Sequence, residues 1–114
     1  MKVAVQGTKE FSNYQVFMRA MGVALSSCDD GEFNVYTAGP AQINSYTSEF
    51  CNLSEVGLKN RGIKVRFYKV PPSYIEDNIS DFTYFAFLSN PSQRPSKLVT
   101  VAEANGIETG LFRY

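Results

Sequence analysis

The chain of 114 residues has the length of one domain, and its 44% hydrophobic and 14% aromatic residues are typical of globular proteins. Its 11 basic and 11 acidic residues argue against a binder of duplex nucleic acid that relies on phosphate neutralisation, although a local basic patch is compatible with this balance. The sequence contains no histidine, which excludes a histidine-based catalytic triad, a histidine metal site and a histidine general base.

The two cysteines, Cys28 and Cys51, lack the spacing of zinc ligands, and we expect both to be reduced packing residues. The apolar run at the N-terminus is too short for a signal peptide, and no stretch of about 18 apolar residues is present to span a bilayer. We therefore expect one cytoplasmic domain covering residues 1–114, with no metal ion, no cofactor and no membrane partner.

The first half of the chain predicts two strands, each followed by a helix. Residues 2–6 and 33–37 are short apolar runs of the kind found in buried strands. Between them, an apolar stripe at helical spacing begins after two N-cap candidates, Ser12 and Asn13. A second helix with one apolar face follows the second strand and is expected to end at about residue 60.

The second half predicts three further strands joined by shorter connections. Residues 63–70 form the third strand, and residues 73–80 form either a loop or a short helix. Residues 82–88 are nearly continuous in large apolar groups and predict the fourth strand. A loop with two prolines leads to a short helix that opens at Ser96, and residues 107–114 predict the last strand.

This alternation predicts an α/β fold, namely a Rossmann-like three-layer sandwich with a mainly parallel sheet of about five strands. Strands without clean polar alternation favour a sheet that helices cover on both faces. Ligands of such folds bind at the C-terminal ends of the strands, near the point where the strand order reverses. Those ends are predicted at residues 7–11, 38–41, 71–74 and 89–96.

The first of these loops carries groups suited to a phosphorylated ligand. Gly7 allows close approach of a backbone, Thr8 offers a hydroxyl group, and Lys9 can pair with a phosphate beside a helix N-terminus. A purely structural turn is the alternative for this loop. Phe11 and Tyr74, expected on such loops rather than in the core, have rings that could stack on a base.

Two further loops have similar chemistry. In the second, Gly39 permits close approach, Pro40 suits a first helical turn, and Asn44 offers an amide, but a plain strand-to-helix turn is the alternative. The third is rich in hydroxyl, amide and cationic groups, which suit an anion but also fit a solvated basic loop. Its candidate ligand-binding residues are Ser89, Asn90, Arg94 and Ser96.

The order of these motifs resembles the small YpsA-related branch of the SLOG superfamily. That branch opens with a hydrophobic strand and Gly-Ser-Arg-Asp-Phe, and residues 7–11 read Gly-Thr-Lys-Glu-Phe. Its Gly-Gly-Ala segment is similar to residues 38–41, and its fourth strand and last helix are similar to residues 81–87 and 101–107. The resemblance covers almost the whole chain, and the short connection before the fourth strand resembles trimmed bacteriophage versions of larger families.

SLOG domains are Rossmann-like and bind nucleotides or nucleotide-derived ligands, and some cleave N-glycosidic bonds. The resemblance implies such a ligand at Gly7, Thr8, Lys9, Gly39 and the loop of residues 89–96. The glycine-rich segment of the hydrolytic relatives is replaced here, and one of two glycines in the second loop is lost. We therefore expect binding of a nucleotide-like ligand without clear catalysis. The alternatives are a protein-interaction module, which self-associates or binds a host protein, and, less favoured, an N-glycosidic hydrolase.

Overall fold

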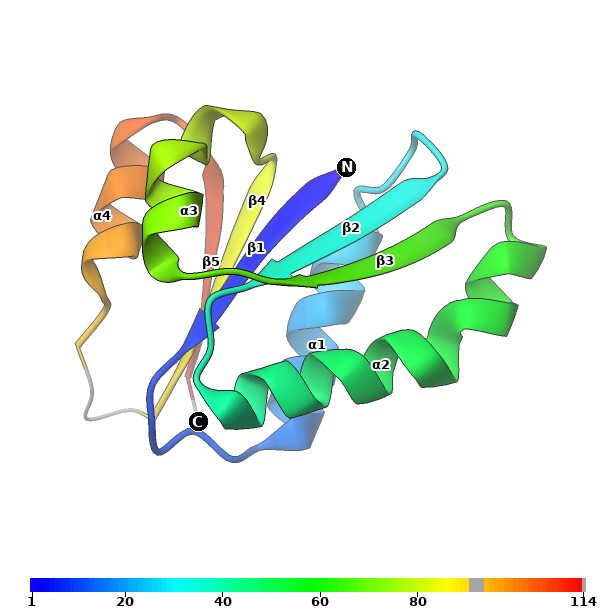
Figure 1. The fold of residues 1–114 in the computed structure, drawn as a ribbon, viewed down its shortest axis with the longest axis horizontal. Coiled ribbons are helices and arrows are strands. Elements are labelled where there is room, and N and C mark those ends of the chain that lie inside the picture. The colour runs from blue at the N-terminus through cyan, green and yellow to red at the C-terminus, as the bar shows by residue number, and fades with distance from the viewer. Residues whose placement is uncertain (91–93, 114) are drawn as a thin grey trace.

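A computed structural model gives the structure of the chain and describes residues 1–90 and 94–113 (Figure 1). Strands and helices alternate along these residues. In chain order they are β1 (Lys2–Gly7), α1 (Tyr14–Leu25), β2 (Glu32–Thr37), α2 (Ala41–Asn60), β3 (Lys64–Lys69), α3 (Pro72–Asp77), a 3-10 turn (Ile79–Asp81), β4 (Tyr84–Ser89), α4 (Lys97–Ala104) and β5 (Glu108–Arg113).

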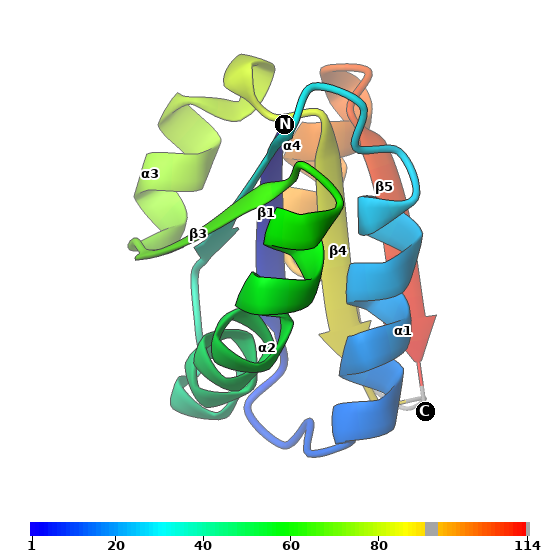
Figure 2. The same ribbon diagram turned by 90° about the vertical axis from the view of Figure 1, so that its right-hand side faces the viewer.

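The strands form one sheet in the order β3-β2-β1-β4-β5, and every neighbouring pair is parallel. Helices α1 and α2 cover one face of this sheet, and α3 and α4 cover the other (Figures 1 and 2). Parallel neighbours require crossover connections, and the helices supply them. The predicted Rossmann-like α/β sandwich with a five-stranded parallel sheet is confirmed.

Each face of the sheet has its own apolar core because successive side chains of a strand point to opposite faces. Val3 and Val5 of β1 pack with α1 and α2, whereas Ala4 packs with α3 and α4, and all three are fully buried. All six residues of β4 are buried, as expected for a central strand covered on both sides. This accounts for its continuous apolar sequence.

Several predicted element boundaries need adjustment. Of the two N-cap candidates, Asn13 caps α1, and its Oδ1 accepts a hydrogen bond from the Val16 backbone N–H at 3.0 Å. The third strand is one residue shorter at each end than predicted, and the fourth begins at Tyr84 because a 3-10 turn occupies residues 79–81. Of the two readings for residues 73–80, the short helix is correct. Tyr114, included in the predicted last strand, lies outside the described residues.

None of the helices in the described residues combines the length and the apolar character needed to cross a bilayer.

The approach of α2 to β1 gives a prediction about Gly7. A Cβ atom on Gly7 would lie 2.7 Å from Ile43 Cγ1 and 3.3 Å from the Leu88 carbonyl oxygen. We expect Gly7→Ala to lower the free energy of unfolding by about 1–3 kcal/mol, measured by urea denaturation, because the added methyl overpacks the core. Gly57→Ala is the matched control.

The control position lies within α2, and a Cβ atom there would meet no atom within 4 Å. Alanine in a helix interior is favoured over glycine, so Gly57→Ala is expected to raise the free energy of unfolding by about 0.5–1 kcal/mol. Equal stability of Gly7→Ala and the unchanged chain would show that α2 is free to move away from β1.

Candidate functional site at the carboxyl edge of the sheet

The strand order reverses between β1 and β4, which lie side by side in the middle of the sheet. The chain leaves β1 toward α1 on one face and leaves β4 toward α4 on the other face (Figure 2). At the start of this divergence, the Thr8 backbone N–H donates to the Leu88 carbonyl oxygen at 2.9 Å. Ligands of open α/β sheets bind at such a reversal, so we take this edge as the candidate site.

Both predicted glycines at this edge have structural roles. Gly7 leaves room for Ile43 of α2, and its backbone N–H donates to the Gly39 carbonyl oxygen at 3.1 Å. Gly39 has a φ of +89°, a conformation that favours glycine, although a Cβ atom there would have space. The structural turn considered for both loops therefore explains these glycines without a ligand.

The turn between β2 and α2 is fixed by a buried threonine. Thr37 is 1% exposed, and its Oγ1 donates to Asn44 Oδ1 at 2.8 Å and accepts from the Gly39 backbone N–H at 3.2 Å. Pro40 is the N-cap residue of α2 and lies just before the first helical turn, not inside it as expected. Thr37 was not predicted to belong to the site, and its position before a Gly-Pro pair was the available signal.

A second hydrogen bond spans the point of reversal. The Ser96 hydroxyl, at the N-cap of α4, donates to Gln6 Oε1 of β1 at 2.5 Å. Ser96 was a predicted site residue, and Gln6 was not, because a glutamine inside an apolar strand gives no sign of its partner. This contact ties the end of β1 to the start of α4.

The remaining predicted residues differ in their exposure. Lys9 and Arg94 are exposed, whereas Thr8 and Asn90 are half-buried and Ser89 is 2% exposed. The part of the third loop covering residues 91–93 lies outside the described residues. Exposed cationic side chains are thus present on both loops beside the reversal.

Phe11 corrects one expectation. Its side chain is 1% exposed and belongs to the core formed with α1 and α2, so it is not available for stacking on a base. The loop of residues 8–13 turns back after Thr8, whose carbonyl oxygen accepts from the Phe11 backbone N–H at 3.1 Å. Burial of an aromatic ring outweighs its position on a loop. Tyr74, the other aromatic residue expected on a loop rather than in the core, is 39% exposed.

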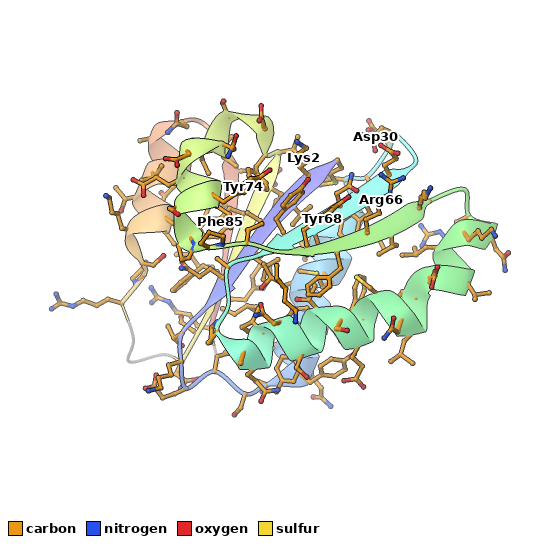
Figure 3. All side chains as sticks on the ribbon, in the orientation of Figure 1. Lys2, Asp30, Arg66, Tyr68, Tyr74 and Phe85 are labelled. Carbon is orange, nitrogen blue, oxygen red and sulfur yellow. The ribbon has the colours of Figure 1, made fainter. Side chains whose placement is uncertain are left out.

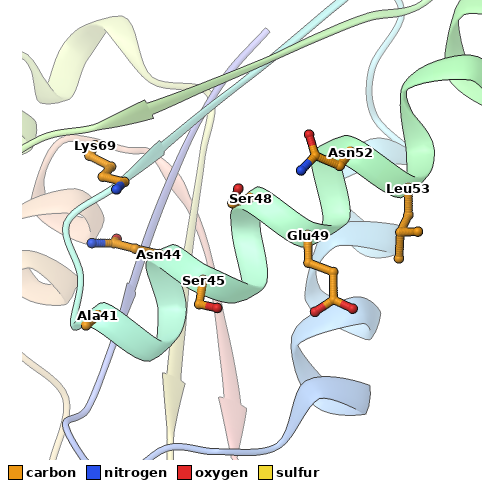
Figure 4. Close-up of a pocket in the computed structure, with 8 residues that line it drawn as sticks. All are labelled: Ala41, Asn44, Ser45, Ser48, Glu49, Asn52, Leu53 and Lys69. Atoms are coloured by element: carbon orange, nitrogen blue, oxygen red, sulfur yellow. The ribbon is translucent and has the colours of Figure 1, made fainter.

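A polar groove of about 560 Å³ lies beside this edge, along α2 (Figure 4). Asn44 and Ser45 line it near the start of the helix, and Lys69 approaches it from the end of β3. Ser48, Glu49 and Asn52 extend it along α2. Of the predicted ligand-binding residues, Asn44 lines this groove, whereas Lys69 was missed because sequence alone does not place β3 beside α2.

Neither cysteine has the properties of an activated nucleophile. Both thiols are free. Burial raises the pKa of Cys51 to about 11. The pKa of Cys28 is also raised, mainly by burial and to a smaller extent by the negative charge of Asp30. A catalytic cysteine needs a lowered pKa. Within residues 1–90 and 94–113, no cluster of three or more cysteine or acidic residues is arranged to hold a metal ion.

We compared the chain with protein-family models, with curated proteins and with solved structures, and none of the three comparisons gives a match. The resemblance to the SLOG superfamily therefore stays a prediction from the sequence motifs.

The hydrogen bond between Thr37 and Asn44 gives a prediction about this edge. We expect Asn44→Ala to lower the free energy of unfolding by about 1–2 kcal/mol in urea denaturation, because the buried Thr37 hydroxyl loses its acceptor. Asn44→Asp keeps an acceptor oxygen near a helix N-terminus and should retain the stability of the unchanged chain. A loss of stability with Asp equal to that with Ala would contradict this role.

The raised thiol pKa values predict slow and strongly pH-dependent alkylation. In a Cys28→Ser variant, the rate of Cys51 reaction with iodoacetamide should rise about tenfold per pH unit from roughly pH 7 to 9.5, because the thiolate fraction still grows there. Free glutathione is the control, and its rate should flatten near the ordinary thiol value of about 8.5. A plateau for Cys51 below pH 9 would show an activated thiol, provided that circular dichroism confirms the fold throughout.

Proposed function

We propose that the chain binds a nucleotide or a nucleotide-derived phosphorylated ligand at the carboxyl edge of the sheet, between the loops that follow β1 and β4. The observation that carries this proposal is the reversal of strand order between β1 and β4. Exposed Lys9 and Arg94 lie on the loops on either side of the reversal. Lysine and arginine are the side chains best suited to pair with phosphate oxygens.

The proposed mode of phosphate binding relies on side chains more than on the first loop's amides. The N–H groups of Gly7 and Thr8 already donate to Gly39 and Leu88, so a phosphate cannot use them without breaking those bonds. Lys9, Arg94 and the positive end of the helix dipole of α2 remain as the attractive groups. The polar groove along α2 offers Asn44, Ser45 and Lys69 to the rest of the ligand.

Catalysis is not part of the proposal. N-glycosidic hydrolysis requires a positioned carboxylate, and no sequence motif assigns one at this edge. The protein-interaction module is the second candidate, and one observation favours it. Leu53 and Val56 of α2 are each 70% exposed and three residues apart, so they lie next to each other on the outer side of the helix.

A thermal-shift screen separates the two candidates. The panel contains mono-, di- and cyclic nucleotides, ADP-ribose and cytokinin-type nucleotides. Ligand at about a hundred times its dissociation constant stabilises the folded chain by about 2.7 kcal/mol, which is a shift of several degrees for a domain of this size. A panel without any shift would contradict ligand binding and favour the interaction module, which sedimentation of the free chain would then test for self-association.

Lys9 provides the variant that locates the ligand. For the nucleotide that gives the largest shift, we expect Lys9→Ala to weaken binding by about 1–3 kcal/mol in calorimetry, the range for a hydrogen bond to a charged group. Lys59→Ala is the matched control, since Lys59 is exposed in the last turn of α2, at the opposite end of that helix. Equal affinity of Lys9→Ala and Lys59→Ala would place the ligand away from the first loop.

A further inference from the structure

One part of the sheet is left open on the side of α3 and α4. Helix α3 has six residues and follows β3 directly, so it covers β2 and β3 incompletely (Figure 1). The side chains of β1, β2, β3 and α3 that border this opening form what we call the tyrosine face. It consists of Lys2, Asn34, Tyr36, Arg66, Tyr68 and Tyr74, of which Figure 3 labels Lys2, Arg66, Tyr68 and Tyr74 on the side of the sheet away from α2.

Three tyrosine rings are stacked on this face. Tyr36 lies 4.6 Å from Tyr68 between ring centroids, with 19° between the ring planes, and 5.9 Å from Tyr74, with 9° between the planes. The ring of Phe82 packs edge-on against the ring of Tyr36, with 5.2 Å between the two ring centroids. Tyr68 and Tyr74 are still 37% and 39% exposed. Aromatic surface therefore remains open to solvent in a fixed, nearly parallel orientation.

Next to the tyrosine rings, a row of side chains across the sheet carries the cations Lys2 and Arg66. Lys2, Asn34 and Arg66 are register partners across β1, β2 and β3, two residues before Tyr36 and Tyr68. Two residues of a strand span about 6.6 Å. One nucleotide can therefore place its base on a tyrosine ring and its phosphate beside a cation of this row. Lys2 Nζ lies 5.8 Å from the centre of the Tyr36 ring, and Arg66 is exposed.

Some of the acidic groups near this face have local partners, and Asp77, three residues after Tyr74 on α3, is exposed. Asp30 Oδ2 pairs with the N-terminal amine at 2.6 Å, Glu32 lies opposite Lys64 in the register of β2 and β3, and Glu76 of α3 pairs with Lys97 at 3.2 Å. The row of Lys2, Asn34 and Arg66 itself holds two cations and no acidic residue, in a chain whose net charge is zero.

We propose that the tyrosine face binds single-stranded nucleic acid, with bases stacking on Tyr68 and Tyr74 and phosphates pairing with Lys2 and Arg66. Aromatic rings beside cations on an open sheet are the combination that stacks unpaired bases and holds their backbone. A duplex keeps its bases stacked internally, where they cannot stack on these rings, so the proposed ligand is unpaired. This inference concerns a different surface from the carboxyl edge and does not depend on the proposed function.

Fluorescence anisotropy with a labelled oligothymidine or oligouridine of about 12 nucleotides, a length typical of such surfaces, tests the proposal at low salt. Tyr68→Ala should weaken binding at least fivefold, the lower end of the loss for one stacked base, whereas Tyr68→Phe retains the ring and should bind as the unchanged chain does. The same sequence as a duplex should bind more weakly than the single strand.

A matched pair of charge variants tests the phosphate contact. Arg66→Gln should weaken binding and reduce the slope of log affinity against log salt by about 0.7, the value for one phosphate contact in a single strand. Arg19→Gln removes an exposed charge from α1, on the other face of the sheet, and should change neither quantity.

Three results would overturn the inference. They are no binding of either single-stranded probe by the unchanged chain, equal losses for Arg66→Gln and Arg19→Gln, and unchanged binding by Tyr68→Ala. Self-association that is abolished in Tyr68→Ala, seen by sedimentation, would assign the face to a second copy instead. The nucleotide screen and the Lys9→Ala variant test binding at the carboxyl edge, which is a separate surface. Either proposal can therefore fail without the other.

Discussion

Helix α2 approaches strand β1 at Gly7 more closely than any side chain at that position would allow, and the geometry of the carboxyl edge depends on this contact. Ile43 packs where a Cβ atom of Gly7 would be, and the Gly7 N–H donates to the Gly39 carbonyl oxygen. The same approach brings Asn44 within hydrogen-bond reach of the buried Thr37. Packing between one strand and one helix thus sets the positions of the turn, the start of α2 and the groove beside it.

The same contact limits the chemistry of the edge. In a glycine-rich phosphate loop, backbone N–H groups point at the ligand. Here the amides of Gly7, the last residue of the strand, and of Thr8 donate to carbonyl oxygens of the protein, and the Ser96 hydroxyl donates to Gln6. A ligand at this edge would therefore be held mainly by the exposed side chains of Lys9 and Arg94.

The two faces of the sheet differ in how completely they are covered. The 20-residue α2 extends along β3, whereas the six-residue α3 leaves part of β2 and β3 open on the other face. Tyrosine suits such a boundary, because its ring packs against neighbours while its hydroxyl end stays in water. Tyr68 and Tyr74 each stack on Tyr36 there and remain partly exposed to solvent.

The sequence by itself determined the alternation of strands and helices and the parallel sheet, and it narrowed the N-cap of α1 to Ser12 or Asn13, because hydrophobic periodicity and capping are local properties of the chain. It also located the loops at the carboxyl edge, since those loops follow the strands directly. Only the tertiary structure decided that Phe11 is buried, that Gly7 is required by Ile43, and that Tyr36 lies between residues of β3 and α3. These facts depend on which strands and helices become neighbours in the fold. The distance between two residues along the chain does not reveal whether their elements are neighbours. Burial and stacking are decided by contacts between distant segments, so the pattern of a single segment cannot reveal them.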